Sequence, residues 1–318
     1  MIIPLKGEVS NRQSVLMNDQ THRHPPQRDT LFLEDALVLS HVAHPGDQYL
    51  LRLQAPECAA KALPGTFVHL RCDPHLPMRR PISIMRVGRQ EGWVDLLYKA
   101  VGEGTRLLAR RQPGETVSTL GPIGRPFEVH PERPRPLLIG GGVGMPPMVF
   151  LAESLRPGTG SVQGIRPLVI LGSEVPFPFP ARPSQHLVPG LPAGAIAAMP
   201  LLDDWGIPSR LASLQGYPGC FEGYVTDLAR HWLSALDETA RAEVEVFACG
   251  PHPMLAAVAR LARDFDLPCQ VSLEEYMACA VGGCAGCVVQ VNTRQGVAMK
   301  RVCVDGPVFD AYQVFLEA

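Results

Sequence analysis

Residues 279–303 read CAVGGCAGCVVQVNTRQGVAMKRVC, and the C-terminal part of the chain must fold around this stretch. Cys279, Cys284 and Cys287 fall within nine residues, and fifteen residues separate the last of them from Cys303. The resulting C-x4-C-x2-C…C spacing is that of plant-type 2Fe-2S ligation. We expect Gly282, Gly283 and Gly286 to let the backbone take positive φ and bring N–H groups close to the sulfur atoms.

A structural zinc site is the alternative for these cysteines. Zinc sites usually combine two short Cys or His pairs separated by a spacer, whereas this chain has three cysteines on one side and one on the other. The spacing therefore favours a 2Fe-2S cluster ligated by Cys279, Cys284, Cys287 and Cys303, and it makes electron transfer the leading class of function.

Composition limits the remaining possibilities. The 318 residues are 46% hydrophobic with a net charge of −2, which allows about two or three domains and offers no basic excess for nucleic acid. No apolar run of about 18 residues suggests a membrane span, and residues 1–30 are polar and unlike a signal peptide. The other five of the nine cysteines are scattered, which fits a reducing compartment. We expect a cytoplasmic protein with a flexible extension at 1–30.

Residues 31–130 alternate short apolar and polar runs with turn residues, as antiparallel strands do. Pro45-Gly46, Pro64-Gly65 and Gly92 separate the runs. The expected strands are 35–44, 48–56, 66–72, 81–87 and 93–101. They predict a small, closed or nearly closed β-barrel.

Two stretches of this region have the chemistry to hold a dinucleotide. Arg80-Pro81-Ile82-Ser83, preceded by Arg79, combines an arginine fork for a pyrophosphate with a strand whose backbone can contact a ring system. Leu97-Tyr98-Lys99 ends a strand, and Gly102-Glu103-Gly104-Thr105 opens a short helix whose first N–H groups can bind phosphate. Tyr98 can pack on a flat cofactor, or be an ordinary half-buried aromatic. The two stretches support a cofactor site only if they meet in space.

Residues 137–155, LLIGGGVGMPPMVFLAESL, predict an apolar strand, a glycine-rich turn and a helix. The strict G-x-G-x-x-G dinucleotide fingerprint fails, because Pro147 stands at its last position. Proline is tolerated in the first turn of a helix. Gly142 and Gly144 can therefore still bring a pyrophosphate to the helix N-terminus, unless they only make a tight turn.

The same region continues as alternating strands and helices. Strands are expected at 166–173, 194–204 and 244–250, and helices at 224–236 and 252–265. This alternation predicts a doubly wound parallel sheet, whose ligands bind at the carboxyl ends of the strands. Ser173-Glu174 and Cys249-Gly250-Pro251 should then join the glycine turn along one edge.

Two side chains at this edge have competing interpretations. Glu174 can accept bonds from the adenine ribose and repel a 2′-phosphate, which favours NAD, but Arg182 lies nearby in the sequence and can reverse that preference. Cys249 can face the nicotinamide, or it can be a small buried residue at the end of a strand.

Together these segments resemble the electron-transfer subunit of the NAD-dependent type of dihydroorotate dehydrogenase. The resemblance covers about residues 31–318 and rests on RPIS (80–83), GGGVGMPP (140–147), CGP (249–251) and RVCVDGPVFDA (301–311). RPIS and CGP are shared with the wider ferredoxin-reductase-like family, whereas the DGPVFD segment after Cys303 is more specific. Lys99 stands where the resemblance leads us to expect arginine, and the last gap between ligands is slightly longer than usual.

The resemblance implies a multidomain β plus α/β fold. The expected parts are the flexible extension at 1–30, an antiparallel FAD-binding β-barrel at 31–130, a doubly wound NAD-binding α/β domain at 131–270 and a small 2Fe-2S cluster domain at 271–318. Carried over to this sequence, the FAD contacts are Arg80, Pro81, Ile82, Ser83, Leu97, Tyr98, Lys99, Gly104 and Thr105. NAD contacts are expected at Gly142, Gly144, Cys249, Gly250 and Pro251.

The implied function is electron transfer in pyrimidine biosynthesis. A partner subunit with FMN oxidises dihydroorotate, and electrons pass through the cluster and FAD to NAD+, in a heterotetramer with two copies of each chain. No catalytic acid–base side chain is needed. Related subunits of a hydrogenase or a ferredoxin:NADPH transhydrogenase are the alternative, and a zinc-containing binding module is a third possibility. Val308, Phe309, Tyr312, Val314 and Phe315 are expected either to anchor the partner or to pack on the cluster domain itself.

Overall fold

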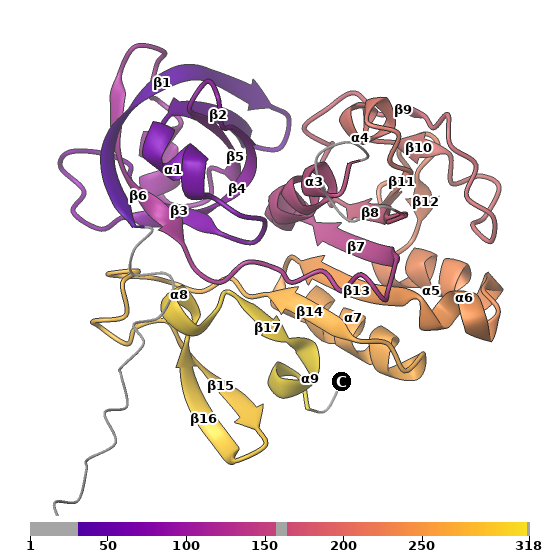
Figure 1. Cartoon of the computed structure of the whole chain (residues 1–318). Coiled ribbons are helices and arrows are strands. Elements are labelled where there is room, and N and C mark those ends of the chain that lie inside the picture. The colour runs from indigo at the N-terminus through magenta and orange to yellow at the C-terminus, as the bar shows by residue number, and fades with distance from the viewer. Residues whose placement is uncertain (1–30, 157–163, 317–318) are drawn as a thin grey trace, which may run out of the picture.

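The computed structural model describes residues 31–156 and 164–316, so the expectation for residues 1–30 lies outside the described residues. Strands β1 to β6 close into an antiparallel barrel in the order β1-β2-β5-β4-β3-β6 (Figure 1). Their bounds are β1 Phe32–His44, β2 Gln48–Gln54, β3 Phe67–Arg71, β4 Arg80–Gly88, β5 Trp93–Lys99 and β6 Thr116–Ile123. The short helices α1 (Pro56–Lys61) and α2 (Glu103–Leu108) lie in its connections.

Side chains that point alternately into and out of the barrel explain how its strands build a core. Along β5, Val94, Leu96 and Tyr98 belong to the barrel interior, whereas Leu97 packs outside it against the second domain. A two-residue period of this kind builds one filled core and one outer face. Strand β6 was not among the strands expected from the sequence, although its buried Val117 and Thr119 follow the same alternation.

The second layer is an α/β sheet with the order β12-β11-β8-β7-β13-β14-β17. Neighbouring strands are parallel except for β14 and β17. The strand bounds are β7 Arg135–Gly141, β8 Leu168–Gly172, β11 Ser209–Ser213, β12 Phe221–Glu222, β13 Val244–Cys249, β14 Cys269–Ser272 and β17 Val308–Asp310. The connecting elements are η2 Gly142–Gly144, α3 Met145–Ser154, α4 Pro200–Asp204, α5 Val225–Ala235, α6 Glu238–Ala242 and α7 His252–Asp264, with a short pair of strands, β9 Arg182–Pro183 and β10 Ala197–Ala198.

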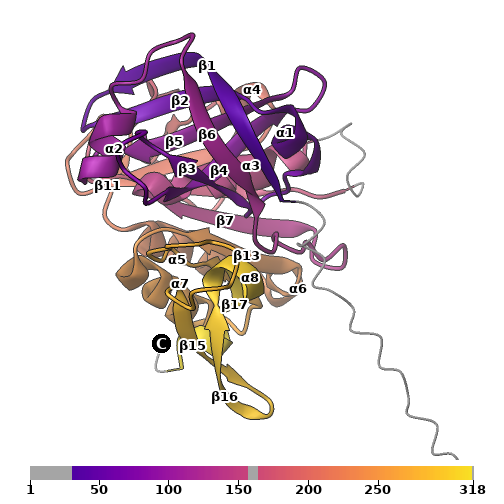
Figure 2. The same cartoon turned by 90° about the vertical axis from the view of Figure 1, so that its left-hand side faces the viewer.

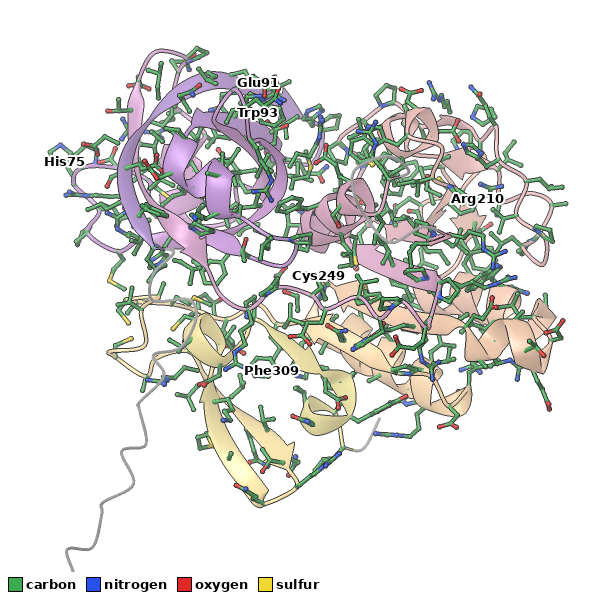
Figure 3. All side chains as sticks on the ribbon, viewed as in Figure 1. His75, Glu91, Trp93, Arg210, Cys249 and Phe309 are labelled. Atoms are coloured by element: carbon green, nitrogen blue, oxygen red, sulfur yellow. The ribbon has the colours of Figure 1, made fainter. Side chains whose placement is uncertain are left out.

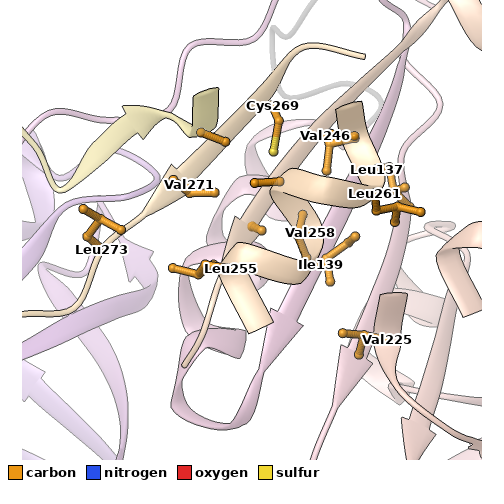
Figure 4. Close-up of a cluster of buried hydrophobic side chains, with 14 of the residues drawn as sticks. Leu137, Ile139, Val225, Val246, Leu255, Val258, Leu261, Cys269, Val271 and Leu273 are labelled. Atoms are coloured by element: carbon orange, nitrogen blue, oxygen red, sulfur yellow. The ribbon is translucent and has the colours of Figure 1, made fainter. Parts of the chain in front are cut away.

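Helices cover both faces of this sheet, which makes it doubly wound as predicted. Leu137 and Ile139 of β7 face α5 and α7, where they pack with Leu255 and Val258 (Figure 4). Leu138, between them, faces α3 and packs with Met148. Because both faces are buried, these strands are continuously apolar rather than alternating.

The strand expected at 194–204 is wrong over most of its length. Only Ala197–Ala198 is extended there, and Pro200 begins helix α4, where its fixed φ and missing N–H suit the first helical position. The sheet strand that follows β8 in space is β11 at Ser209–Ser213, which pairs in parallel with β8.

The C-terminal segment folds partly on its own and partly on the sheet. Strands β15 (Val288–Thr293) and β16 (Gly296–Arg301) form a separate hairpin, flanked by α8 (Val302–Asp305) and α9 (Ala311–Val314). Strand β17 instead joins the edge of the sheet, antiparallel to β14. Figure 2 shows the hairpin projecting below the sheet.

The apolar residues after Cys303 are mostly not available to a partner. Val308, Phe309 and Phe315 are buried in this chain's own cores, and Figure 3 shows Phe309 on β17. They anchor the C-terminal segment to the α/β sheet, so of the two alternatives that the sequence left open, packing on this chain itself holds for these three.

Shared cores hold the barrel, sheet and cluster segment together. Met85 and Leu97 of the barrel pack with Met148 and Val149 of α3, and Phe67 and Ile123 belong to the core that contains Met277 and Cys303. Among the described residues, no helix is both long and apolar enough to cross a membrane. The predicted domain boundaries at 30/31, 130/131 and 270/271 remain predictions.

Candidate electron-transfer site

The cysteine loop turns its backbone N–H groups toward its own sulfur atoms. The N–H of Cys284 donates to Cys279 Sγ and that of Gly286 donates to Cys284 Sγ, each at 3.4 Å. Left-handed φ angles occur at Ala280 (56°), Gly282 (81°) and Ala285 (52°). Of the three glycines, only Gly282 takes the expected positive φ. The expected approach of backbone N–H groups to sulfur holds at Gly286, which donates to Cys284 Sγ, and at Gly283, whose backbone helps to lower the pKa of Cys279. Nothing in the sequence marked the two alanines.

Gly283 and Gly286 lack the expected positive φ. A Cβ at Gly286 would lie 3.4 Å from Cys284 Sγ, so this glycine allows close approach to sulfur without positive φ. A Cβ at Gly283 would meet nothing within 4 Å.

The four sulfur atoms suit two metal ions better than one. Cys287 Sγ and Cys303 Sγ lie 3.4 Å apart, and Cys279 is linked to Cys284 through that residue's N–H. Two cysteine pairs fit a two-iron cluster, in which each iron takes two of the four sulfur ligands, and the assignment of these four ligands stays a prediction.

The environment of the thiols differs from one side of the loop to the other. Burial favours a raised pKa for Cys279, but backbone N–H groups around the sulfur outweigh it and hold the pKa at about 7. Burial, with the Cys287 thiol beside it, raises the pKa of Cys303 to about 12. Cys287 and Cys303 are buried and Cys284 is exposed, so one edge of the loop faces solvent.

The two predicted flavin stretches do meet in space. A Cβ on Gly104 would lie 2.8 Å from Arg80 Nε and 3.0 Å from Arg80 Cζ, so the Arg80 guanidinium lies directly over the start of α2. Arg80 forms no ion pair with any described residue, and its guanidinium donates to the backbone oxygens of Met78 and Arg79. A free cation beside helix N–H groups fits the phosphates of a dinucleotide.

Arg79 is not part of such a fork. Its guanidinium donates to the His69 carbonyl at 3.1 Å, to the Ser118 carbonyl at 2.7 Å and to Ser118 Oγ at 2.9 Å. These bonds tie Arg79 to β3 and β6. Of the two arginines, only Arg80 is left to bind a ligand.

The ring of Tyr98 has partners within the protein. It is 2% exposed, stacks on Tyr49 with ring centroids 5.5 Å apart, and shares a 2.9 Å hydrogen bond between its hydroxyl and His41 Nε2. Burial raises the pKa of Tyr98. Pro81, Ser83 and Lys99 are half-buried, whereas Ile82, Leu97 and Thr105 are buried. Contact of this set with FAD stays a prediction.

The glycine turn and the CGP segment also come together, because β7 and β13 are neighbours. A Cβ on Gly144 would lie 2.3 Å from the Cys249 oxygen and 2.5 Å from the Gly250 nitrogen. Gly142 has φ 55° and open space where a Cβ would stand, and Pro146 and Pro147 occupy the first turn of α3. Cys249 is fully buried on the barrel side of the sheet (Figure 3), and Pro251 is exposed. Their contact with NAD stays a prediction.

The nucleotide turn lies against the flavin strands. Helix α3 packs on β4, the strand that begins at Arg80, and η2 packs on β5. Arg86 of β4 pairs with Glu153 of α3 at 3.2 Å. A flavin on β4 and β5 and a nucleotide at η2 would therefore be neighbours, as hydride transfer requires.

Comparison with known proteins decides the family. The iron–sulfur cluster binding domain of dihydroorotate dehydrogenase B matches residues 274–315. The "dihydroorotate dehydrogenase B (NAD(+)), electron transfer subunit" of Desulforamulus reducens is 32% identical over 291 residues, covering 89% of this chain and 98% of that protein. The subunit of the same name from Bacillus caldolyticus is 36% identical over 260 residues, covering 80% of this chain and 87% of that protein. This chain belongs to the family of dihydroorotate dehydrogenase B electron transfer subunits.

A solved structure extends the comparison to the fold. The NADH-dependent reduced ferredoxin-NADP oxidoreductase, studied for flavin-based electron bifurcation, superposes with a TM-score of 0.69 at 25% identity, covering 88% of this chain and 90% of that chain. The family predicted from the sequence and its ferredoxin-reductase-like fold are thus confirmed. Electron transfer is the function of the family, and neither the transhydrogenase alternative nor the zinc module is better supported.

Proposed function

We propose that the chain carries electrons from a dihydroorotate-oxidising partner subunit, through a 2Fe-2S cluster on its four cysteines and an FAD on its barrel, to NAD+. The observation that supports this most is that one chain brings three features together: a pair of cysteines in one core with Phe67 and Ile123 of the barrel, Arg80 without an ion-pair partner among the described residues at the start of β4, and a glycine turn packed on β5. When bound, FAD supplies a carrier that exchanges two electrons with nicotinamide and single electrons with a cluster.

The protein's own groups then have positioning tasks. Cys279, Cys284, Cys287 and Cys303 hold the irons, and the N–H groups of Cys284 and Gly286 stabilise charge on sulfur. Arg80 neutralises the pyrophosphate of FAD over the start of α2. The close packing of Gly144 on Cys249 keeps the nucleotide beside the flavin strands. The exposed Cys284 edge is where electrons from the partner enter.

The partner is proposed to be an FMN-containing dihydroorotate dehydrogenase subunit, in a heterotetramer of two copies of each chain. An FMN-binding catalytic barrel needs about 200 residues or more, and the described elements already belong to the FAD barrel, the nucleotide sheet and the cluster segment. We also propose a cytoplasmic location, since all nine cysteines lie in the described ranges and none forms a disulfide.

The division of labour is tested with the purified chain loaded with FAD and cluster. Dihydroorotate alone is expected to leave its flavin oxidised, whereas NADH should reduce the flavin and support reduction of an artificial acceptor. Adding the FMN-containing partner should allow dihydroorotate to bleach the flavin absorbance. Bleaching without the partner would overturn the proposal.

A second experiment concerns nucleotide choice. Glu174 is exposed just after β8, and Arg182 is engaged in ion pairs with Asp203 and Asp204 of α4. With Arg182 neutralised, the Glu174 carboxylate would repel a 2′-phosphate, so NADH should reduce the flavin about tenfold faster than NADPH or more. Stopped-flow measurements should give a smaller ratio of the NADH rate to the NADPH rate for Glu174→Gln than for the wild type. Glu222→Gln, on β12, should leave this ratio unchanged. Equal wild-type rates with the two nucleotides would contradict the assignment.

A further inference from the structure

The register of the barrel places His69 between the flavin strands and the cluster segment. His69 lies on β3 opposite Pro81 of β4 and Leu120 of β6. Residues directly opposite each other project from the same face of a sheet, and Pro81 belongs to the predicted flavin contacts. Figure 1 shows β3 on the side of the barrel nearest α8 of the cluster segment.

The face that carries His69 is the face that meets the cluster segment. Phe67, two residues before it on β3, packs in one core with Met277, Ala280 and Cys303. Val68 and Leu70 point into the barrel. His69 is therefore directed out of the barrel at the junction with the cluster segment, where the flavin strand β4 also lies.

The imidazole of His69 is fully buried, and its ring nitrogens are poorly satisfied by the surrounding protein. The residue is 0% exposed, and neither ring nitrogen makes a well-aligned hydrogen bond to a described residue, although backbone groups of Met277 and Arg79 lie close to the ring. Burial lowers the pKa of His69 to about 4, only partly opposed by the nearby backbone of Met277, so the ring is neutral near pH 7. Met277 lies two residues before Cys279.

A histidine at this buried position destabilises the fold relative to an apolar residue. Burying polar atoms without partners costs free energy that an apolar side chain of similar volume would not cost. Packing alone would thus be better served by leucine or phenylalanine. The ring nitrogens beside the Met277 backbone point to a polar contact with the cluster segment in the cofactor-loaded protein.

We propose that His69 is a positioning residue, whose imidazole holds the segment from Met277 to Cys279 in register with the flavin strands so that electrons pass efficiently between FAD and the cluster. The inference rests on the proposed function, since it needs both cofactors in this chain. It gives His69 no contact with NAD and no proton-transfer step.

The test uses the full chain loaded with FAD and cluster. NADH supplies two electrons as a hydride to the flavin; one then passes to the cluster and one remains on the flavin, and stopped-flow absorbance follows the two steps separately. His69→Phe keeps a planar ring and removes the nitrogens. It should leave flavin reduction unchanged and slow reduction of the cluster about tenfold or more. His69→Gln, which restores a polar group, should recover most of the rate.

A matched control and a second measurement separate positioning from general damage. His44, at the opposite end of β1 from the cluster segment, also has a buried ring nitrogen without a partner among the described residues, and His44→Phe should not change the cluster step. Independently of activity, amide hydrogen exchange at 277–287 should be faster in His69→Phe than in the wild type or His69→Gln.

Each contrary result has its own meaning. If NADH reduces the flavin but not the cluster of the wild-type chain, the proposed function fails, and this inference with it. If the wild type transfers electrons and His69→Phe does so at the same rate with unchanged exchange, the inference alone is refuted. Equal slowing of both steps, or no recovery in His69→Gln, would also refute it. If His69→Phe does not bind the cofactors, His69→Leu takes its place. The rate of cluster reduction and the amide exchange at 277–287 are then compared between His69→Leu and His69→Gln in the same way.

Discussion

Cys287→Ser is expected to lose the iron–sulfur cluster while keeping FAD in the barrel. Cys287 is buried with its sulfur 3.4 Å from that of Cys303, so the two would form one half of the proposed ligand set. A serine hydroxyl is a shorter and harder ligand that does not replace a thiolate for iron. Iron and sulfide content should fall to near zero, and the visible absorption of the cluster should disappear.

The flavin and nucleotide sites serve as the internal reference for this loss. Arg80 and Gly104 lie in the barrel domain and Gly144 in η2 after β7, all outside the cysteine loop. NADH should therefore still reduce the bound FAD. Cys284→Ser should behave like Cys287→Ser, and Cys220→Ser, a half-buried cysteine near β12, should keep its iron. Wild-type iron content in Cys287→Ser would show that the ligand assignment is wrong.

Gly144→Ala is expected to disrupt the predicted nucleotide site. The added Cβ would lie 2.3 Å from the carbonyl oxygen and 2.4 Å from the carbonyl carbon of Cys249. These are backbone atoms of β13, which cannot move without separating η2 from the strand. The free energy of unfolding should fall by about 3 kcal/mol or more, and flavin reduction by NADH should slow by about a hundredfold.

Gly142→Ala is the matched control, two residues away in the same turn. It meets nothing within 4 Å, but its φ of 55° is strained for alanine, at a cost of about 1–2 kcal/mol. Denaturant unfolding and stopped-flow reduction should therefore separate a steric cost at 144 from a smaller conformational cost at 142. If the two variants lose the same stability and rate, the turn does not depend on close contact with Cys249.

The features that the sequence determined by itself are those that depend on residues close together along the chain. The spacing of Cys279, Cys284 and Cys287 specifies a loop around a metal centre because three ligands so close along the chain can reach one small cluster. Alternation in segments such as 93–101 predicts barrel strands, and Gly142-x-Gly144 followed by proline predicts a strand-to-helix turn. In each case the neighbours that matter lie within a few residues.

The tertiary structure decided everything that depends on partners far along the chain. It separates Arg79, held by Ser118, from Arg80, which stays free over Gly104. It decides between the two alternatives for Phe309, which lies in this chain's own core beside β14 and not on a surface open to a partner. It also places His69 beside the cluster segment, more than 200 residues later in the sequence. Local patterns carry no record of these contacts, because they form only when the barrel, the sheet and the cysteine loop bury their apolar faces against one another.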